Sequence, residues 1–355
     1  RKVFVPMTPD SLLSAYQSVN ASHRRQMVWH VGVDAGFFAE YSAMLNAMIY
    51  CLKRHWRFTL YADDANFGWA KGWSDYFEPF CEEVHEAFHH RYNLYPSPSW
   101  RSWISQKERR RAISLGWMLK LRWRHAVGNV LALKTYGRRV RLSHSLKLKP
   151  DQVVVPELDI DLPYIEAFGR MADITWRFNA ETRRAVDALI DSLDLSPHFI
   201  ACQLRGGDKV TETALLPVSR YVEPLTRLAK GRDVYVLTDD YRLFEELCRL
   251  APSLSLKTLC RPTEQGYVNS AFAASGGEAK RVQMQRFLAG IELLRRSDCY
   301  LGSVTTGPSC FMFKSALAKG VAIDCDQADI VDIINQPIAE RARRAALYLT
   351  AHPQP

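Results

Sequence analysis

The second half of the chain alternates short apolar runs with longer amphipathic stretches, and this alternation constrains the fold more than any other feature. The apolar runs have the length and composition of buried strands, and they lie at 199–204, 234–237, 299–302 and 321–323. Helical spacing of apolar residues predicts helices at 218–230, 241–250, 281–296 and 309–318. Strands that alternate with helices form parallel sheets, because each connection has to cross back over the sheet. The pattern therefore predicts an α/β fold.

The first half repeats this pattern less regularly. Apolar residues at 28–33 and 58–61 predict two strands, and the segment between them, 37–54, has helical spacing. A helix capped by Asn179 is expected to run to about Leu193. At about 150 residues per domain, 355 residues indicate two domains. We predict an N-terminal α/β domain over 1–195, a C-terminal Rossmann-like domain over 196–335, and a C-terminal helix and tail over 336–355.

The charge balance narrows the class of partner. The 47 Lys and Arg residues outnumber the 38 Asp and Glu residues, a formal excess of +9. This excess favours an anionic partner: a nucleic acid, a phosphorylated small molecule or an anionic surface. No apolar run reaches the roughly 18 residues of a membrane helix, so no integral membrane segment is expected. The eight cysteines form no CxxC pair and favour a cytoplasmic protein, with a trimmed Golgi-type or membrane-anchored form as the alternative, because the chain starts at Arg1.

A charged turn follows the first strand of the second half. It reads Gln203-Leu204-Arg205-Gly206-Gly207-Asp208-Lys209-Val210-Thr211-Glu212. Arg205 can form a bidentate contact with phosphate oxygens, and the glycine pair lets the backbone approach a ligand. Glu212 is a candidate general base, with Lys209 near enough to tune its pKa. A polar turn with one surface salt bridge is the alternative.

Polar turns also follow two later strands. Asp239 and Asp240 can meet a ribose hydroxyl or an active-site Lys, or an Asp here is the N-cap of the next helix. Ser303, Thr305 and Thr306 precede a helix and form an anion cradle or an ordinary capped turn. No GxxxxGK[ST] loop occurs, and no GxGxxG follows the first strand. Together the turns predict a phosphate- or nucleotide-binding cleft, because ligands of parallel sheets lie beyond the carboxyl ends of the strands.

In order and spacing, these turns resemble the α-1,6-fucosyltransferases, the family of the core fucosyltransferase of animal N-glycans and the bacterial nodulation fucosyltransferase. The family signature His-x-Arg-Arg-x-Asp-Lys, followed by Val and a Thr-Glu pair, corresponds to 203–212. Its Thr-Asp-Asp corresponds to 238–240, and its hydroxyl-rich turn to 303–306. In the first half, Gly36-Phe37-Phe38 and 72–79 resemble the family's glycine turn and its Gly-Trp…Phe-x-Pro element.

The resemblance implies a GT-B-like architecture, in which two Rossmann-type domains face a central cleft. It implies an inverting enzyme that transfers fucose from GDP-fucose to a hydroxyl of an oligosaccharide or other glycan acceptor. No metal, further cofactor or nucleic-acid partner is expected. Catalytic roles fall on Arg205 at the pyrophosphate, on Glu212 as the base, and on Asp208 and Lys209, which orient and polarise the base. Donor-binding roles fall on Gly36, Phe37, Gln203, Arg205, Asp239, Asp240, Ser303, Thr305 and Thr306.

Three departures from the family pattern keep a different nucleotide sugar open as the donor. The family's leading His is Gln203 here, and its second Arg is Gly206. The aspartate that reads guanine in the family falls near Gly290, which has no side chain. We expect Glu292 or a backbone group to take its place, unless the donor base differs.

Two further features suggest other classes of protein. The segment 85–89 reads His-Glu-Ala-Phe-His and matches HExxH, the helical motif of zinc hydrolases, with a surface or partly buried helix as the alternative. A basic helix predicted over 107–127, with Trp117 and Trp123, fits a nucleic-acid-binding protein, or a solvated helix face with its Trp in the core. The basic residues of this region are Arg109, Arg110, Arg111, Lys120, Arg122, Arg124, Arg138, Arg139, Arg141 and Lys147.

Overall fold

The computed structural model describes residues 8–32, 36–93, 115–116, 119–120, 122–123, 126–127, 152–206 and 216–353. The chain divides into two compact units, Arg1–Arg177 and Phe178–Pro355, and each is described by itself. The predicted α/β class is confirmed, because both units contain parallel strands connected by helices. No helix in the described ranges is long and apolar enough to cross a membrane.

The first unit contains a parallel sheet with the order β1-β2-β3. Its strands are β1 (Arg25–His30), β2 (Trp56–Tyr61) and the short β3 (Glu82–Glu83). The crossover from β1 to β2 is α2 (Phe37–Arg54), which ends at His55 in the left-handed conformation. The remaining elements are α1 (Pro9–Ser22), η1 (Gly72–Asp75), α3 (Phe88–Tyr92), β4 (Gln152–Val155), η3 (Pro156–Leu158), β5 (Ile160–Pro163) and α7 (Tyr164–Thr175).

Aromatic side chains form the core of this unit. Phe37, at the start of α2, contacts Phe77, Phe67 and Trp176 with ring centroids 5.1 to 6.3 Å apart. The loop before η1 is closed by Asp75, whose carboxylate accepts four backbone N–H bonds from residues 69–72, at 2.7 to 3.0 Å. The Gly-Trp…Phe-x-Pro element is therefore part of the packing of this unit.

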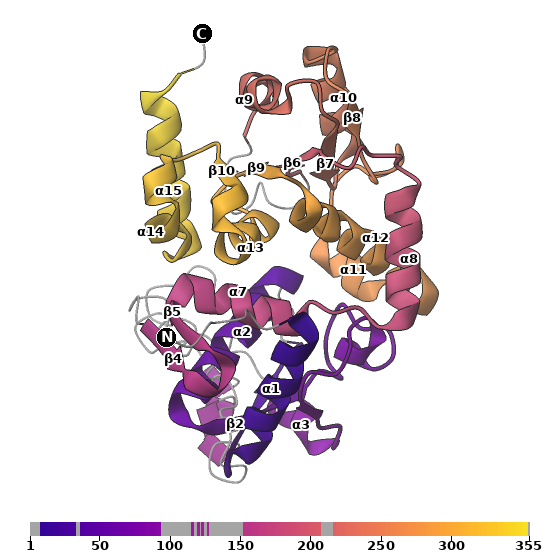
Figure 1. Cartoon of the computed structure of the whole chain (residues 1–355). Coiled ribbons are helices and arrows are strands. Elements are labelled where there is room, and N and C mark those ends of the chain that lie inside the picture. Colours follow the sequence, from indigo (N-terminus) through magenta and orange to yellow (C-terminus); the bar gives the residue numbers. More distant parts are fainter. Residues whose placement is uncertain are drawn as a thin grey trace. The chain divides into compact units, whose positions relative to one another are not determined.

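The second unit contains one parallel sheet in its described residues, with the order β10-β9-β6-β7-β8 (Figure 1). The strands are β6 (Ile200–Leu204), β7 (Val234–Thr238), β8 (Leu256–Lys257), β9 (Cys299–Gly302) and β10 (Gly320–Ala322). Every residue of the central strand β6 is buried, as expected for a parallel strand that is covered on both faces. In chain order the sheet reads 3-2-1-4-5, which is the Rossmann order.

The helices of the second unit follow the predicted pattern. They are α8 (Ala180–Asp191), α9 (Ser219–Ala229), α10 (Tyr241–Leu250), α11 (Asn269–Ala274), α12 (Gly277–Arg296), α13 (Gly307–Ser315), α14 (Ile330–Ile334) and α15 (Ile338–Ala351), with short 3-10 turns η5 (Leu317–Lys319) and η6 (Gln327–Asp329). The compact unit begins before α8, whereas the sequence placed the boundary near Leu195. The physical reason is that α8 packs on α12, where Arg183 lies 3.4 Å from Glu292.

Candidate functional site

The strand order of the second unit locates its candidate site. In an open, doubly wound sheet, ligands bind beyond the carboxyl ends of the strands at the point where the strand order reverses. Here that point lies between β6 and β9, which pair directly. The turns that begin after these two strands are 205–206 and 303–306. Two of the three sequence-predicted turns therefore meet at this switch point, and the third, 238–240, follows the neighbouring strand β7.

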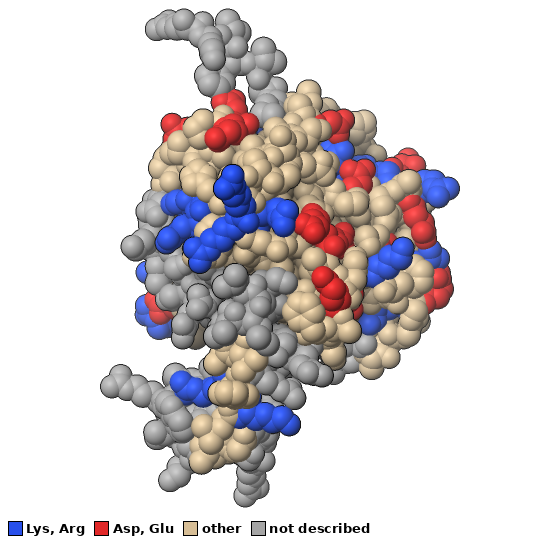
Figure 2. Space-filling view, turned by 90° about the horizontal axis from the view of Figure 1, so that it is seen from below, with Lys and Arg blue, Asp and Glu red and all other residues tan. Residues whose placement is uncertain are grey.

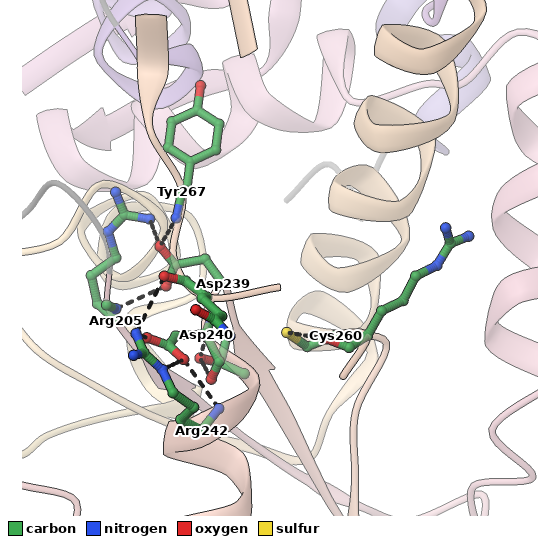
Figure 3. Close-up of polar contacts among 10 residues, drawn as sticks. Arg205, Asp239, Asp240, Arg242, Cys260 and Tyr267 are labelled. Carbon is green, nitrogen blue, oxygen red and sulfur yellow. Dashed lines mark hydrogen bonds and ion pairs between the residues drawn. The ribbon is translucent and has the colours of Figure 1, made fainter. Parts of the chain in front are cut away.

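Arg205 is held in place by Asp239 (Figure 3). The guanidinium donates to Asp239 Oδ2 at 2.5 Å, and the same carboxylate accepts the backbone N–H groups of Gly206 at 2.8 Å and Tyr267 at 3.0 Å. The Arg205 guanidinium also lies 5.6 Å from the centroid of the Tyr267 ring. Because both charged side chains are largely buried, this pair fixes a cation at the end of β6.

Asp240 has a structural role in the same region. It is the N-cap of α10, and its carboxylate accepts from the Arg242 side chain at 2.6 and 2.9 Å. These hydrogen bonds to Arg242 lower the pKa of Asp240. A Cβ atom at Gly206 would lie 2.9 Å from the Asp240 Cβ, a distance that side chains do not tolerate. A larger side chain at position 206 would therefore require Asp240 to shift.

The hydroxyls of the turn 303–306 bond within the protein. The Gln203 side-chain oxygen accepts from the hydroxyls of Thr306 at 2.7 Å and Ser309 at 2.6 Å. The Ser303 hydroxyl donates to Asp324 at 2.6 Å and lies 2.7 Å from the Thr305 hydroxyl. These side chains shape the turn that leads into α13, a helix whose N-terminal end attracts anions.

Two residues of this region were missed by sequence reasoning. Asp324 follows β10 and also accepts the Val304 N–H at 3.0 Å. Arg341, on α15, donates to the Val304 carbonyl at 3.0 Å and contacts the Cys310 sulfur at 2.6 Å. An acid directly after a predicted strand was a usable signal for Asp324. No local pattern marked Arg341, which reaches the turn through the packing of the C-terminal helix.

The buried Asp324 is expected to make stability depend on pH. Burial raises its pKa above the ordinary value of 3.8, so the native state holds this proton to a higher pH than the unfolded chain does. Its contribution to the free energy of unfolding is therefore complete below pH 3.8 and is lost as the pH rises through the native pKa. Asp324→Asn, which cannot titrate, should lack this decline when urea unfolding is compared from pH 4 to pH 8. Equal pH slopes in the two proteins would contradict the assignment.

The other predicted site residues have different positions. Asp208, Lys209 and Glu212 lie in 207–215, outside the described residues. Gly36 and Phe37 belong to the first unit: Gly36 is the N-cap of α2, and Phe37 is buried in the aromatic core. Phe37 is therefore a core residue in this structure, although the resemblance placed it at the donor.

The positions expected to replace the guanine-reading aspartate lie in α12. Gly290 is buried in α12, where a Cβ atom would lie 2.7 Å from a Leu237 methyl and 2.8 Å from the Tyr235 hydroxyl. The carboxylate of Glu292 is largely buried and pairs with Arg183 at 3.4 Å and Arg296 at 3.1 Å. Glu292 therefore connects α12 to α8, and a base contact by Glu292 or a backbone group stays a prediction.

The HExxH interpretation is also wrong. Helix α3 begins at Phe88, so His85 lies before it and pairs with Asp63 at 2.7 Å. His89 is buried, and its Nδ1 lies 3.1 Å from Nε2 of His30. The two motif histidines therefore do not share one helix face. In the ranges that the structure describes, no three His, Cys, Asp or Glu side chains are grouped to hold a metal ion.

The basic helix falls mostly outside the described residues. Its described fragments are helical, and Lys120 and Arg122 are exposed. Trp123 is 71% exposed, so the expectation that this Trp packs in the core was wrong. Trp117 and the other basic residues of this region lie outside the described ranges.

Comparison with known proteins links this fold to a class of enzyme structures. No protein-family model and no curated protein sequence matches the chain. Among solved structures, a variant of Arabidopsis thaliana FUT1 in complex with GDP is 12% identical, with a TM-score of 0.50, over 91% of this chain and 81% of that chain. NodZ α-1,6-fucosyltransferase co-crystallised with GDP is 13% identical over 83% of this chain and 93% of that chain, with a TM-score of 0.47. Fucosyltransferase NodZ from Bradyrhizobium is 14% identical over 83% and 92%, also at 0.47.

Of these three, the FUT1 structure is the one on which the fold assignment rests. At this sequence identity the likeness shows the fold alone. The predicted resemblance to the fucosyltransferases is therefore confirmed for the fold.

Proposed function

We propose that this protein is a glycosyltransferase of the fucosyltransferase type, which moves fucose from GDP-fucose to a hydroxyl of a glycan acceptor. The observation that carries the proposal is the cation at the switch point: Arg205, fixed by Asp239, lies at the end of β6 beside the turn of β9. The likeness to FUT1, which is in complex with GDP, supports a guanine nucleotide as the ligand. The GT-B arrangement, with the two units facing a cleft, belongs to the same proposal.

The chemistry needs a fixed positive charge where Arg205 lies. An acceptor hydroxyl oxygen attacks the anomeric carbon of fucose while the bond from that carbon to the diphosphate breaks, which inverts the carbon. The acceptor proton passes to Glu212, and GDP leaves with the bonding electrons and gains negative charge. Fixed donors stabilise this charge without the reorganisation that water would need. Arg205 and the start of α13 supply such a field, so the proposed reaction is independent of a metal.

Another nucleotide sugar is the second candidate for the donor. The resemblance places the family's guanine-reading aspartate near Gly290, and that position packs against Leu237 and Tyr235. Glu292 is engaged by Arg183 and Arg296. The packing at Gly290 and the ion pairs of Glu292 favour two alternatives. Either protein groups other than these two residues contact the guanine, or the donor carries a different base.

Titration calorimetry of the purified protein with GDP and with UDP, in EDTA, tests the proposal. We expect GDP to bind with a micromolar Kd and UDP to give no heat, because the proposal needs a guanine site and no metal. A preference for UDP would be consistent with a glycosyltransferase but would contradict GDP-fucose as its donor. Heat from neither nucleotide would contradict the proposal, and binding that requires added Mg²⁺ would contradict its metal-independent part.

A further inference from the structure

Five Lys and Arg side chains and two His side chains gather at one edge of the first unit, where β1 and β2 begin and α2 ends. The parallel register pairs Arg25 with Trp56 and Gln26 with Arg57, so two segments distant in sequence become neighbours. The residues of this basic edge are His23, Arg24, Arg25, Lys53, Arg54, His55 and Arg57. Figure 2 shows adjoining Lys and Arg side chains on the face of the molecule seen from below.

The helix dipole accounts for only part of this charge. Lys53 and Arg54 lie in the last turn of α2, where cations are favourable. Arg24, Arg25 and Arg57 lie outside that helix, on or next to strands. The Arg57 guanidinium lies 3.9 Å from the Glu82 carboxylate, and both side chains are exposed to solvent, so this pair contributes little. Its five Lys and Arg side chains give the edge its positive charge.

Two aromatic rings lie among these cations. The Arg25 guanidinium lies 4.0 Å from the Trp56 ring centroid, and the Arg54 guanidinium lies 5.5 Å from that of Tyr50. The two rings also contact each other in a T-shaped geometry, with centroids 5.7 Å apart. Both rings are half-buried, so the ring faces are engaged by protein groups while part of each ring still reaches the surface.

We propose that the basic edge docks the protein on an anionic phospholipid surface. Arg and Lys are attracted to phosphate headgroups, and amphipathic Trp and Tyr rings suit the boundary between headgroups and water. A single-stranded nucleic acid is disfavoured, because its bases need open aromatic faces to stack on and here the guanidinium groups lie over them. If the protein docks by the amino ends of β1 and β2, the carboxyl ends of these strands point away from the lipid.

Vesicle co-sedimentation of the full chain tests this proposal. We expect binding to phosphatidylcholine vesicles that contain 30% phosphatidylglycerol, weak binding to pure phosphatidylcholine, and release in 0.5 M NaCl. Each basic residue near an anionic surface contributes roughly fivefold to the affinity. The triple variant Arg24→Gln, Arg25→Gln and Arg54→Gln should therefore bind roughly 100-fold more weakly.

A matched variant separates the basic edge from overall charge. Arg184→Gln, Arg227→Gln and Arg249→Gln remove the same three charges from exposed positions of the second unit, and this variant should bind within about twofold of the original chain. Thermal unfolding confirms that both variants are folded. Equal losses in the two variants, no binding to anionic vesicles, or tighter binding to a random oligonucleotide than to the vesicles would each overturn the proposal.

Discussion

Arg205→Ala is expected to reduce fucose transfer by about 10³-fold, because one preorganised donor to a developing negative charge contributes about 10²–10³ and this donor carries a full charge. Binding of GDP alone should weaken by about 10- to 100-fold, since a hydrogen bond to a charged group contributes roughly 1.5–3 kcal/mol. The larger effect on transfer follows because, in the proposed reaction, the diphosphate gains charge as the bond to fucose breaks. Calorimetry with GDP and transfer of labelled fucose to a mixed oligosaccharide pool measure the two effects.

Arg242 offers a matched control for this prediction. It also pairs with an aspartate at the end of a strand, Asp240, at 2.6 Å, but its side chain is 63% exposed, compared with 22% for Arg205. Arg242→Ala removes an arginine and its ion pair with the buried Asp240, one strand away from the switch point, and it should leave GDP binding within about threefold, because the exposed guanidinium lies away from the proposed site and is screened by solvent. Similar losses in the two variants, or near-normal transfer by a folded Arg205→Ala protein, would contradict the role assigned to Arg205.

Local signals in the sequence were sufficient for the long elements of the fold. Helices α2 and α10 have the predicted bounds, because apolar spacing defines their length and Asp240 caps the start of α10. The buried strands β6, β7 and β9 were found by their apolar runs. Strand β8 was missed because it has two half-buried residues, too few for any periodicity. The prediction of a helix over the whole HExxH segment was wrong, because a short motif does not specify where a helix begins and α3 begins only at Phe88.

The candidate site was predictable in position but not in detail. The three turns could be placed at one end of the sheet because alternating strands and helices predict parallel strands, whose carboxyl ends lie together. The ion pair between Arg205 and Asp239 connects the ends of β6 and β7. It depends on the register of these two strands, which cannot be predicted from the sequence. The sequence suggested that the hydroxyls of 303–306 bind a ligand. In the structure, Ser303 donates to Asp324 and Thr306 donates to Gln203. These two acceptors lie after β10 and on β6. Tertiary contacts of this kind decide whether a polar side chain faces a ligand or supports a turn.

Gly302→Ala is expected to destabilise the protein by about 3 kcal/mol, at the upper end of what overpacking a dense core usually costs. The new methyl would lie against the Tyr300 hydroxyl, 2.5 Å from the Ser309 hydroxyl and 2.6 Å from Tyr300 Cζ. Tyr300 is fully buried, so its ring has no space to move into. Ser309 also donates to Gln203, so the strain should reach the turn beside Arg205 and weaken GDP binding as well.

Gly36→Ala is the control for Gly302→Ala, because it adds the same methyl group at a position where no packing is disturbed. Gly36 has an ordinary φ of −62°, and a Cβ atom there would meet nothing within 4 Å. The reduced freedom of the unfolded chain and the poorer N-cap oppose each other, so the free energy of unfolding should change by less than about 1 kcal/mol. Urea unfolding of both variants measures the contrast, and GDP calorimetry on Gly36→Ala tests whether this glycine contacts the donor. A Gly302→Ala protein as stable as the original would show that the core around Tyr300 and Ser309 is looser than the structure indicates, and that the turn does not depend on it.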